Sequence, residues 1–208
     1  MNYRFLATLT IVAAMTAHAY ASGKPTAEEF RINARNAGIF GKWGAVVRCP
    51  SGTYATGVAL SIEPRKGRDH DDTGANRVRL YCTTPNGNRE SVLESDGRLF
   101  GTWSETYRCP RGQVLYAYRL GLERHLGSGH DDTMANSLEM RCRRPKSYGE
   151  PTGVVTLKIM GPFHDRWTAW ESCPVNSSIA GMQTKDEEGL HSDGDDTALN
   201  DVAFYCKR

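Results

Sequence analysis

The sequence predicts an all-β protein in which three similar sheets pack around a common axis as a three-sided prism. Two observations support this prediction. A cysteine-centred pattern occurs three times at fixed spacing, and apolar residues alternate along runs inside each copy. Alternation with a period of two is typical of β-strands, whereas no window shows the apolar stripe of an amphipathic helix.

The repeat combines a tryptophan, two cysteines and an Asp-Asp-Thr-x-x-Asn motif. In every copy the tryptophan precedes the first cysteine by 6 residues, and the second cysteine follows the first by 33. The copies occupy about residues 28–82, 90–142 and 153–206. The repeat is too long for one hairpin, so we expect each copy to form a small sheet. The copies contain Trp43, Cys49, Asp71, Asp72, Thr73, Asn76 and Cys82; Trp103, Cys109, Asp131, Asp132, Thr133, Asn136 and Cys142; and Trp167, Cys173, Asp195, Asp196, Thr197, Asn200 and Cys206.

Each copy is expected to contribute four strands. The second strand carries the tryptophan and runs into the first cysteine, and two alternating strands follow a Cys-Pro turn. Asn76, Val78, Leu80 and Cys82 share one face of the last strand in the first copy, and the other copies repeat this arrangement. In the third copy, Thr184 and Asp186 replace apolar residues and predict a more exposed strand end. The first strands are expected at 30–37, 90–98 and 154–161.

The first 21 residues have the layout of a secretory signal peptide. Arg4 supplies the positive charge, an apolar stretch runs over residues 5–15, and small residues around Ala19 and Ala21 suit a cleavage site. The stretch is too short to span a bilayer. We therefore expect a secreted, extracellular protein whose single domain covers residues 22–208.

Six cysteines in a secreted chain predict three disulfides. Composition alone leaves many pairings open. Because the spacing is equal in every copy, the expected bonds are Cys49–Cys82, Cys109–Cys142 and Cys173–Cys206.

The repeated motif and the Gly-x-Trp segments resemble the vitelline membrane outer layer protein I family over essentially the whole mature chain. The resemblance is carried by Gly194-Asp195-Asp196-Thr197-Ala198-Leu199-Asn200-Asp201, Gly41-Lys42-Trp43 and Gly101-Thr102-Trp103. It implies a β-prism of three four-stranded Greek-key sheets with pseudo-threefold symmetry. It also implies a role in an extracellular coat or matrix, with a link to chito-oligosaccharides. His70 and His130 depart from the pattern, because the third copy has Gly194 at that place.

The Asp-Asp-Thr-x-x-Asn motif is interpreted as a structural loop anchor. Asn76, Asn136 and Asn200 fall on the same strand face as core residues, so their amides must be hydrogen-bonded to loop groups. Alternatives are a ligand or cation contact, or acid–base catalysis by the paired carboxylates. The anchors are Asp71, Asp72, Thr73, Asn76, Asp131, Asp132, Thr133, Asn136, Asp195, Asp196, Thr197 and Asn200.

Trp170 is the candidate for stacking against a sugar ring. It belongs to the third copy alone and, in a regular strand, would lie on the face opposite Trp167. Trp43, Trp103 and Trp167 recur in register and are interpreted as core or sheet-edge packing residues.

The sequence assigns no catalytic residue, metal or cofactor. One acidic loop cannot supply the ligands that calcium or zinc needs, and no catalytic or phosphate-binding motif is present. With a net charge of +2, the chain also shows no basic footprint for nucleic acid. The local basic cluster Arg141, Arg143, Arg144 and Lys146 is interpreted as a solvated loop.

The leading functional hypothesis is a non-catalytic extracellular coat or matrix protein that binds glycans or glycoproteins. One alternative is a carbohydrate-active enzyme, either a transglycosylase or a hydrolase, acting on N-acetylglucosamine oligomers. Another is a secreted lectin-like or toxin-like domain. Threefold repetition without a single acidic constellation favours binding or structure over catalysis. The oligomeric state stays open.

Overall fold

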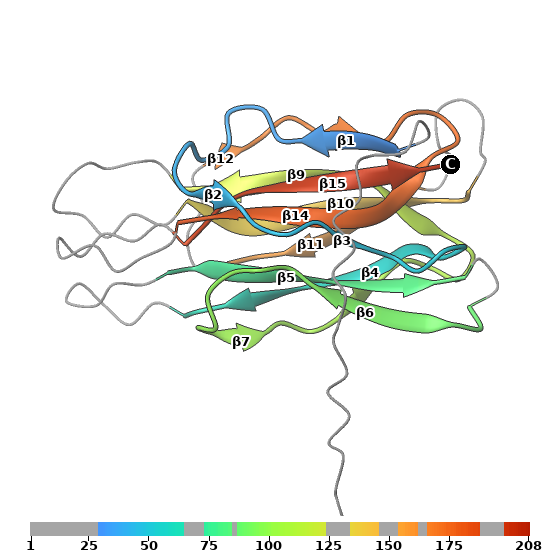
Figure 1. The fold of residues 1–208 in the computed structure, drawn as a ribbon, viewed down its shortest axis with the longest axis horizontal. Helices are drawn as coiled ribbons and strands as arrows, with labels where there is room; N and C mark the ends of the chain where they lie inside the picture. Colours follow the sequence, from blue (N-terminus) through green and yellow to red (C-terminus); the bar gives the residue numbers. More distant parts are fainter. Residues whose placement is uncertain are drawn as a thin grey trace, which may run out of the picture.

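Six long strands form three antiparallel hairpins, one from each sequence repeat (Figure 1). The computed structural model describes residues 29–64, 73–84, 87–123, 134–145, 154–161, 166–187 and 198–208. Every regular element in those ranges is a β-strand, which confirms the all-β class. The hairpins consist of β4 (Tyr54–Ile62) with β5 (Ala75–Thr83), β9 (Val114–Leu122) with β10 (Ala135–Arg143), and β14 (Ser178–Asp186) with β15 (Leu199–Lys207).

Shorter strands complete each repeat, and the tryptophan strand is split into two pieces. The first short strands are β1 (Glu29–Asn33), β6 (Glu90–Glu94) and β11 (Val155–Ile159). The tryptophan pieces are β2 (Lys42–Trp43) and β3 (Val47–Arg48), β7 (Thr102–Trp103) and β8 (Tyr107–Arg108), and β12 (Arg166–Trp167) and β13 (Glu171–Ser172).

A hydroxyl side chain accounts for this interruption in two of the repeats. The backbone N–H of Leu60 donates to Ser104 Oγ at 3.2 Å, and the backbone N–H of Leu120 donates to Thr168 Oγ1 at 3.0 Å. The side-chain oxygen thus takes the place of a carbonyl in the ladder. Both pieces still pair with the same long strand, so together they act as the fourth strand of the sheet.

Each sheet takes its long hairpin from one repeat and its short strands from the next. The first sheet has the order β6-β5-β4-β7, the second β11-β10-β9-β12 and the third β1-β15-β14-β2; β8, β13 and β3 pair with β4, β9 and β14. The expectation that each repeat forms its own sheet is therefore wrong. The connection from β5 to β6 is short, so β6 folds back beside β5, whereas the Cys-Pro turn carries the chain into the next sheet.

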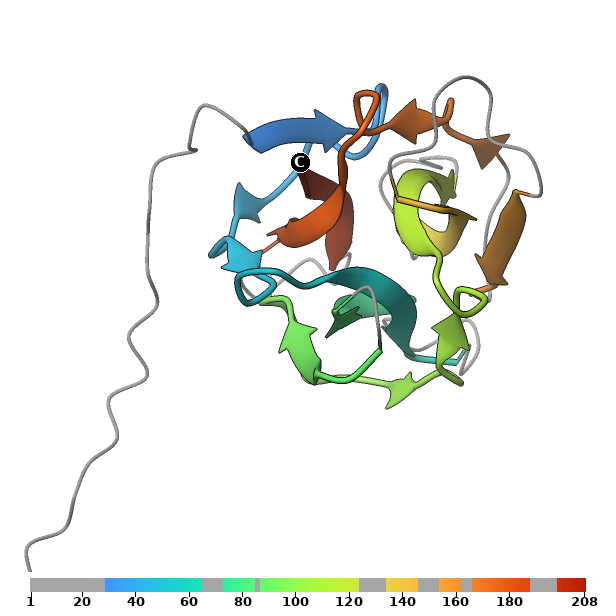
Figure 2. The ribbon, with the colours of Figure 1, turned by 90° about the vertical axis from the view of Figure 1, so that its right-hand side faces the viewer.

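The predicted Greek-key topology is confirmed for sheets that combine the hairpin of one repeat with the short strands of the next. In chain order, β4, β5, β6 and β7 lie as β7-β4-β5-β6, with the fourth strand beside the first. In the third sheet the same pattern joins the two ends of the described chain, because β1 pairs with β15 from Glu29↔Lys207 to Asn33↔Ala203. Figure 2 shows the three sheets arranged around a common centre.

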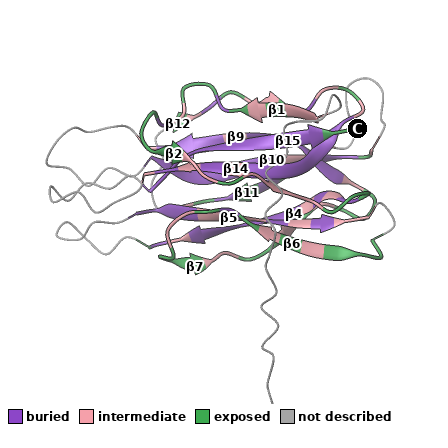
Figure 3. Cartoon of the chain, viewed as in Figure 1, coloured by how far each residue is buried: buried purple, intermediate pink, exposed green. Residues whose placement is uncertain are grey.

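The inner faces of the sheets form one hydrophobic core. The long strands are mostly buried, while β1, β6 and β7 are half-buried or exposed (Figure 3). The predicted alternation holds in β5, where Asn76, Val78, Leu80 and Cys82 have no exposed surface and the intervening residues are half-buried.

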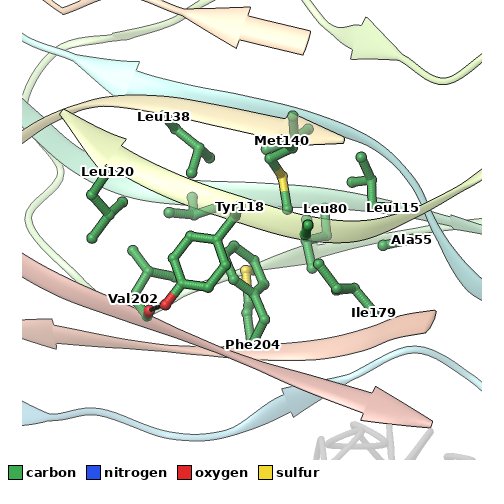
Figure 4. Packing of buried hydrophobic residues seen from close by; sticks show 14 of the residues in the cluster. Ala55, Leu80, Leu115, Tyr118, Leu120, Leu138, Met140, Ile179, Val202 and Phe204 are labelled. Carbon is green, nitrogen blue, oxygen red and sulfur yellow. Dashed lines mark hydrogen bonds between the residues drawn. The ribbon is translucent and has the colours of Figure 1, made fainter. Parts of the chain in front are cut away.

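Tyr118 ties the second sheet to the third inside this core. Its ring meets the Phe204 ring edge-on, with the centroids 4.6 Å apart, and its hydroxyl donates to the Val202 carbonyl oxygen at 2.6 Å (Figure 4). Burial raises the pKa of Tyr118 well above its usual range. The hydroxyl therefore stays protonated and acts as a donor between the two sheets.

The end of β14 is buried, contrary to the expected exposure. Thr184 has no exposed surface and Asp186 is 8% exposed. Thr184 Oγ1 donates to the Asp96 carbonyl oxygen at 3.0 Å, so the connection after β6 covers this end of the third sheet. A polar residue is tolerated here because a neighbouring segment satisfies it.

Each disulfide joins two neighbouring sheets. The bonds are Cys49–Cys82, Cys109–Cys142 and Cys173–Cys206, the pairs that the repeat spacing predicts. The first cysteine of each pair follows β3, β8 or β13, and the second lies on β5, β10 or β15. Because of the strand exchange, the bonds run from the third sheet to the first, from the first to the second and from the second to the third.

Candidate functional site

The recurring asparagines are fully buried, and Asn76 is hydrogen-bonded within its own loop. Asn76 Nδ2 donates to Thr73 Oγ1 at 2.7 Å and to the Gly74 carbonyl oxygen at 3.2 Å. Thr73 Oγ1 in turn donates to Glu63 Oε2 at 2.6 Å. Glu63, Thr73 and Asn76 are all buried, so this chain of bonds closes the β4–β5 loop.

Asn200 repeats the local bond of Asn76, whereas Asn136 makes a bond to a neighbouring sheet. Asn200 Nδ2 donates to the Ala198 carbonyl oxygen at 3.2 Å. Asn136 Oδ1 accepts from the Ala75 N–H at 3.3 Å and so connects the second sheet to the first. These contacts support the loop-anchor role, which stays a proposal. The aspartates of the motif, together with Thr133, Thr197, His70 and His130, lie outside the described residues.

A cation lies over each recurring tryptophan on the outer face of its sheet. Arg31 lies 4.3 Å from the Trp43 ring centroid, Arg79 lies 3.9 Å from Trp103, and Arg119 lies 4.8 Å from Trp167. The tryptophans are half-buried on the edge strands β2, β7 and β12. They are therefore sheet-edge packing residues.

The outer face of the second sheet carries an ion network around a buried carboxylate. Glu139 is 4% exposed; its Oε2 accepts from Arg119 Nε at 2.7 Å, and its Oε1 lies 3.4 Å from Lys158 Nζ. Beside it, a Cβ on Gly121 would lie 3.3 Å from the Trp167 ring, so glycine allows the indole to approach the sheet. This network fixes Arg119 between the carboxylate and the ring.

Trp170 stacks on Arg141 and lies on the same side of the sheet as Trp167. The Arg141 guanidinium is 3.8 Å from the Trp170 centroid, and Arg119 contacts both indoles, at 4.8 Å and 5.0 Å. The predicted placement on opposite faces is therefore wrong. The strand is interrupted between β12 and β13, so the period of two fails. Trp170 is half-buried and packs partly against the core.

The Trp170–Arg141 pair is absent from the other two sheets, where an arginine lies over a tyrosine instead: Arg108 is 4.5 Å from the Tyr81 ring centroid, and Arg48 is 5.2 Å from that of Tyr205. Thr106 occupies the place of Trp170 in the first sheet and donates to the Tyr81 hydroxyl at 2.9 Å. Tyr81 occupies the place of Arg141 there. In the part of the chain that the structure describes, no carboxylate pairs with Arg141, and its Nε is buried without an acceptor. Among the described residues no acceptor pairs with its terminal guanidinium N–H groups either, and these groups, not the buried Nε, can donate to a bound group.

The basic cluster around Arg141 is not a solvated loop. Arg141 and Arg143 belong to β10, and Arg143 is 8% exposed. Burial lowers the pKa of Arg143. Its guanidinium donates to the Pro174 and Ser177 carbonyl oxygens at 3.1 and 2.6 Å. Lys146 lies outside the described residues.

Asp201 is a buried carboxyl on the outer face of the third sheet. It is 5% exposed, and Oδ1 accepts from the Val202 N–H at 2.7 Å. Burial raises the pKa of Asp201 to about 7, although Lys185 and Arg31 act in the opposite direction. This carboxyl therefore titrates near neutral pH.

A pocket of about 130 Å³ lies where the first sheet meets the turn after β8. Sequence reasoning missed it, as it missed the Arg141 partner of Trp170. Comparing the three copies position by position shows which residues differ, but it does not show which of them face one another. The lining residues are Thr56, Thr83, Thr84, Gly87, Arg108, Cys109, Pro110, Arg111, Gly112, Gln113 and Val114.

Across the described ranges, no three His, Cys, Asp or Glu side chains gather as a metal-ligand set. No helix in those ranges is long and apolar enough to cross a membrane.

Three Greek-key sheets, joined by disulfides around a pseudo-threefold axis, define a disulfide-linked β-prism protein. Residues 30–208 match the family model of vitelline membrane outer layer protein I. The chain belongs to this family, as the resemblance of its repeats implied.

Curated relatives extend over most of the chain. The vitelline membrane outer layer protein 1 homolog of Homo sapiens is 38% identical over 179 residues, which cover 85% of this chain and 82% of that protein. The homolog of Mus musculus is 34% identical over 179 residues, covering 84% and 82%.

Solved structures of lectins are also similar. A variant of Malaysian banana lectin matches with a TM-score of 0.49 and 10% identity, covering 86% of this chain and 96% of that one. Calystegia sepium agglutinin matches with a TM-score of 0.47 and 13% identity, covering 89% and 99%.

Proposed function

We propose that this protein is a secreted component of an extracellular coat or matrix, where it binds glycans or glycoproteins without catalysis. The family and its curated relatives are named for the outer layer of the vitelline membrane. Three disulfides suit an oxidising extracellular setting. The threefold-repeated sheets offer broad outer faces for a partner.

The observation that carries the binding proposal is the Trp170–Arg141 stack. An indole face packs against the C–H face of a sugar ring, and a guanidinium donates hydrogen bonds to its oxygens. Arg119 is held by Glu139, so Arg141 is the arginine with donors to spare at this place. Because the other sheets lack the pair, the outer face of the second sheet is the proposed glycan site.

A glycan-array screen of residues 22–208, with and without calcium, tests the proposal. The variants Trp170→Thr and Arg141→Tyr introduce the residues that the first sheet has at these places, which preserves the fold. Each is expected to weaken binding about tenfold, the effect of losing one stacking or cation contact. Trp43→Phe on the third sheet is the matched control and should bind as the wild type does. Unchanged binding by Trp170→Thr would contradict the proposed site.

A carbohydrate-active enzyme is the second candidate function, and the raised pKa of Asp201 favours it. A carboxyl that is protonated near neutral pH can act as a general acid toward a glycosidic oxygen that reaches it, but Asp201 is only 5% exposed. The test is turnover of N-acetylglucosamine oligomers by wild type, Asp201→Asn, Asp72→Asn, Asp132→Asn and Asp196→Asn. We expect no robust turnover by the wild type. If the wild type does show robust turnover and one folded variant loses it, the enzyme hypothesis replaces the non-catalytic proposal.

Residues 1–21 are proposed to be a signal peptide, and residues 22–208 a single domain. The support is the arrangement of Arg4, the apolar stretch and the small residues near Ala19 and Ala21. Intact mass and N-terminal sequencing of the exported protein test this. A mature chain that still begins at Met1 would contradict it.

A further inference from the structure

The pocket beside Cys109 exists because two small side chains stand where larger ones fill the equivalent place. In the second sheet, the residues at the positions of Thr56 and Thr83 are Tyr116 and Arg143. The Arg143 guanidinium lies 4.4 Å from the Tyr116 ring centroid, and it donates to the Pro174 and Ser177 carbonyl oxygens. In the first sheet neither side chain is present, and a pocket of about 130 Å³ remains.

The walls of this pocket present hydrogen-bond acceptors. The Thr83 hydroxyl donates to Thr56 Oγ1 at 3.2 Å, and the Thr56 hydroxyl donates to the Tyr81 carbonyl oxygen at 3.3 Å. Both hydroxyl protons are thus used, and Thr83 Oγ1 is left as an acceptor. Gln113 Oε1 is buried and has no donor in the part of the chain that the structure describes.

Gln113 is itself a departure from the threefold pattern. Thr53 and Ser177 occupy its place in the other two turns, and each donates its hydroxyl to the carbonyl oxygen of the turn proline at 2.7 Å. Gln113 replaces that closed bond with a longer side chain. None of the described residues donates to the amide oxygen, and a buried unpaired acceptor is unfavourable, so this atom is available to a water molecule or to a donor on a bound ligand.

Charge restricts which donor fits. Arg108 and Arg111 line the same pocket; Glu90 neutralises Arg108 through two hydrogen bonds of 2.7 and 3.2 Å. Arg111 is exposed at the rim, where it disfavours an ammonium or guanidinium ligand. An inorganic anion such as sulfate brings no donor for Gln113 or Thr83, and an anionic sugar would donate only through its neutral hydroxyl groups. Neutral hydroxyl groups satisfy both requirements.

We propose that this pocket binds one neutral sugar residue of a glycan, with ring hydroxyls donating to Gln113 Oε1 and Thr83 Oγ1. The volume is well below the roughly 300–1,000 Å³ of pockets for drug-sized ligands, so a single residue fits and a chain of them does not. Pro110 and Val114 supply apolar walls for the ring. The inference rests on the proposed glycan-binding function and adds a second site, away from Trp170.

The experiment is a titration of isotope-labelled residues 22–208 with neutral methyl glycosides of glucose, galactose, mannose and N-acetylglucosamine, followed by NMR. Glucuronate and methylguanidinium are the anionic and cationic comparisons. We expect the amides of Thr56, Thr83 and Gln113 to shift with a neutral glycoside, with a dissociation constant of about 1 mM for so small a ligand.

Two variants make the test specific. Thr83→Arg introduces the side chain that fills the equivalent pocket, so it should keep the fold and melting temperature while abolishing the shifts. Gln113→Thr introduces the residue that the equivalent turn after Cys49 has at this place. It should weaken binding about tenfold through loss of one acceptor. The inference is overturned if no neutral glycoside shifts these amides, or if methylguanidinium or glucuronate alone shifts them. It is also overturned if the folded Thr83→Arg variant binds a neutral glycoside as the wild type does.

The same data separate this inference from the proposed function. Glycan-array binding that depends on Trp170, without shifts at the pocket, would refute the pocket and leave the function. Shifts at the pocket that Thr83→Arg abolishes, together with an array on which no glycan binds, would support the pocket and refute the coat-glycan function.

Discussion

Ionisation of Asp201 is expected to make the folded protein less stable as the pH rises from about 4 to about 7. The pKa of this buried carboxyl is about 7, compared with an ordinary value of 3.8. The folded state therefore holds the proton more tightly than the unfolded state does. The stabilisation is complete below about pH 4, declines as the pH rises, and is lost above about pH 7.

The difference in pKa fixes the size of the effect. Each pKa unit corresponds to about 1.4 kcal/mol, so ionising Asp201 lowers the free energy of unfolding by about 4 kcal/mol. Asp201→Asn keeps the shape and the acceptor for the Val202 N–H, and it carries no charge. It should resemble the wild type near pH 4 and exceed it by about 4 kcal/mol at pH 8.

Urea unfolding of both proteins at intervals from pH 4 to pH 9 measures this difference. Glu105→Gln serves as the control, because that carboxyl is on an exposed residue and its removal should leave the pH profile of the wild type unchanged. If Asp201→Asn and wild type keep a constant difference over the whole range, burial does not govern this carboxyl and the reasoning fails.

Two further predictions concern contacts between sheets. Tyr118→Phe should lower the free energy of unfolding by about 1–3 kcal/mol, because it leaves the Val202 carbonyl oxygen without its 2.6 Å donor; an unchanged urea midpoint would contradict this. Asn136→Ala should cost about 1–3 kcal/mol through loss of its bond to the Ala75 N–H and should leave glycan binding intact. Lost binding at an unchanged melting temperature would instead make the motif a functional site.

The strands and disulfides were accessible from sequence, whereas the partners of the short strands were not. Alternation at Asn76, Val78 and Leu80 reports which face is buried, and equal spacing reports which cysteines pair. Neither signal says whether β6 pairs with the hairpin before it or the one after it, since every copy offers the same surface. The connection length from β5 to β6 decides between them.

The candidate sites depend on departures from the repeat, which periodicity cannot detect. Trp170 was noticed because it is unique, but its orientation required a regular strand, and Thr168 interrupts that strand. The pocket depends on Thr83 being small where Arg143 is large. Such differences become informative only once the structure shows which positions face one another.

The placement of the disulfides has a consequence for cleavage by proteinases. Each bond spans the segment between the two long strands of one hairpin, from Cys49 to Cys82 and at the two equivalent places. A cut within any of these segments leaves both fragments covalently joined. A cut between Cys82 and Cys109, or between Cys142 and Cys173, leaves no disulfide across the break. A proteinase can therefore nick one of these hairpins without separating the two fragments.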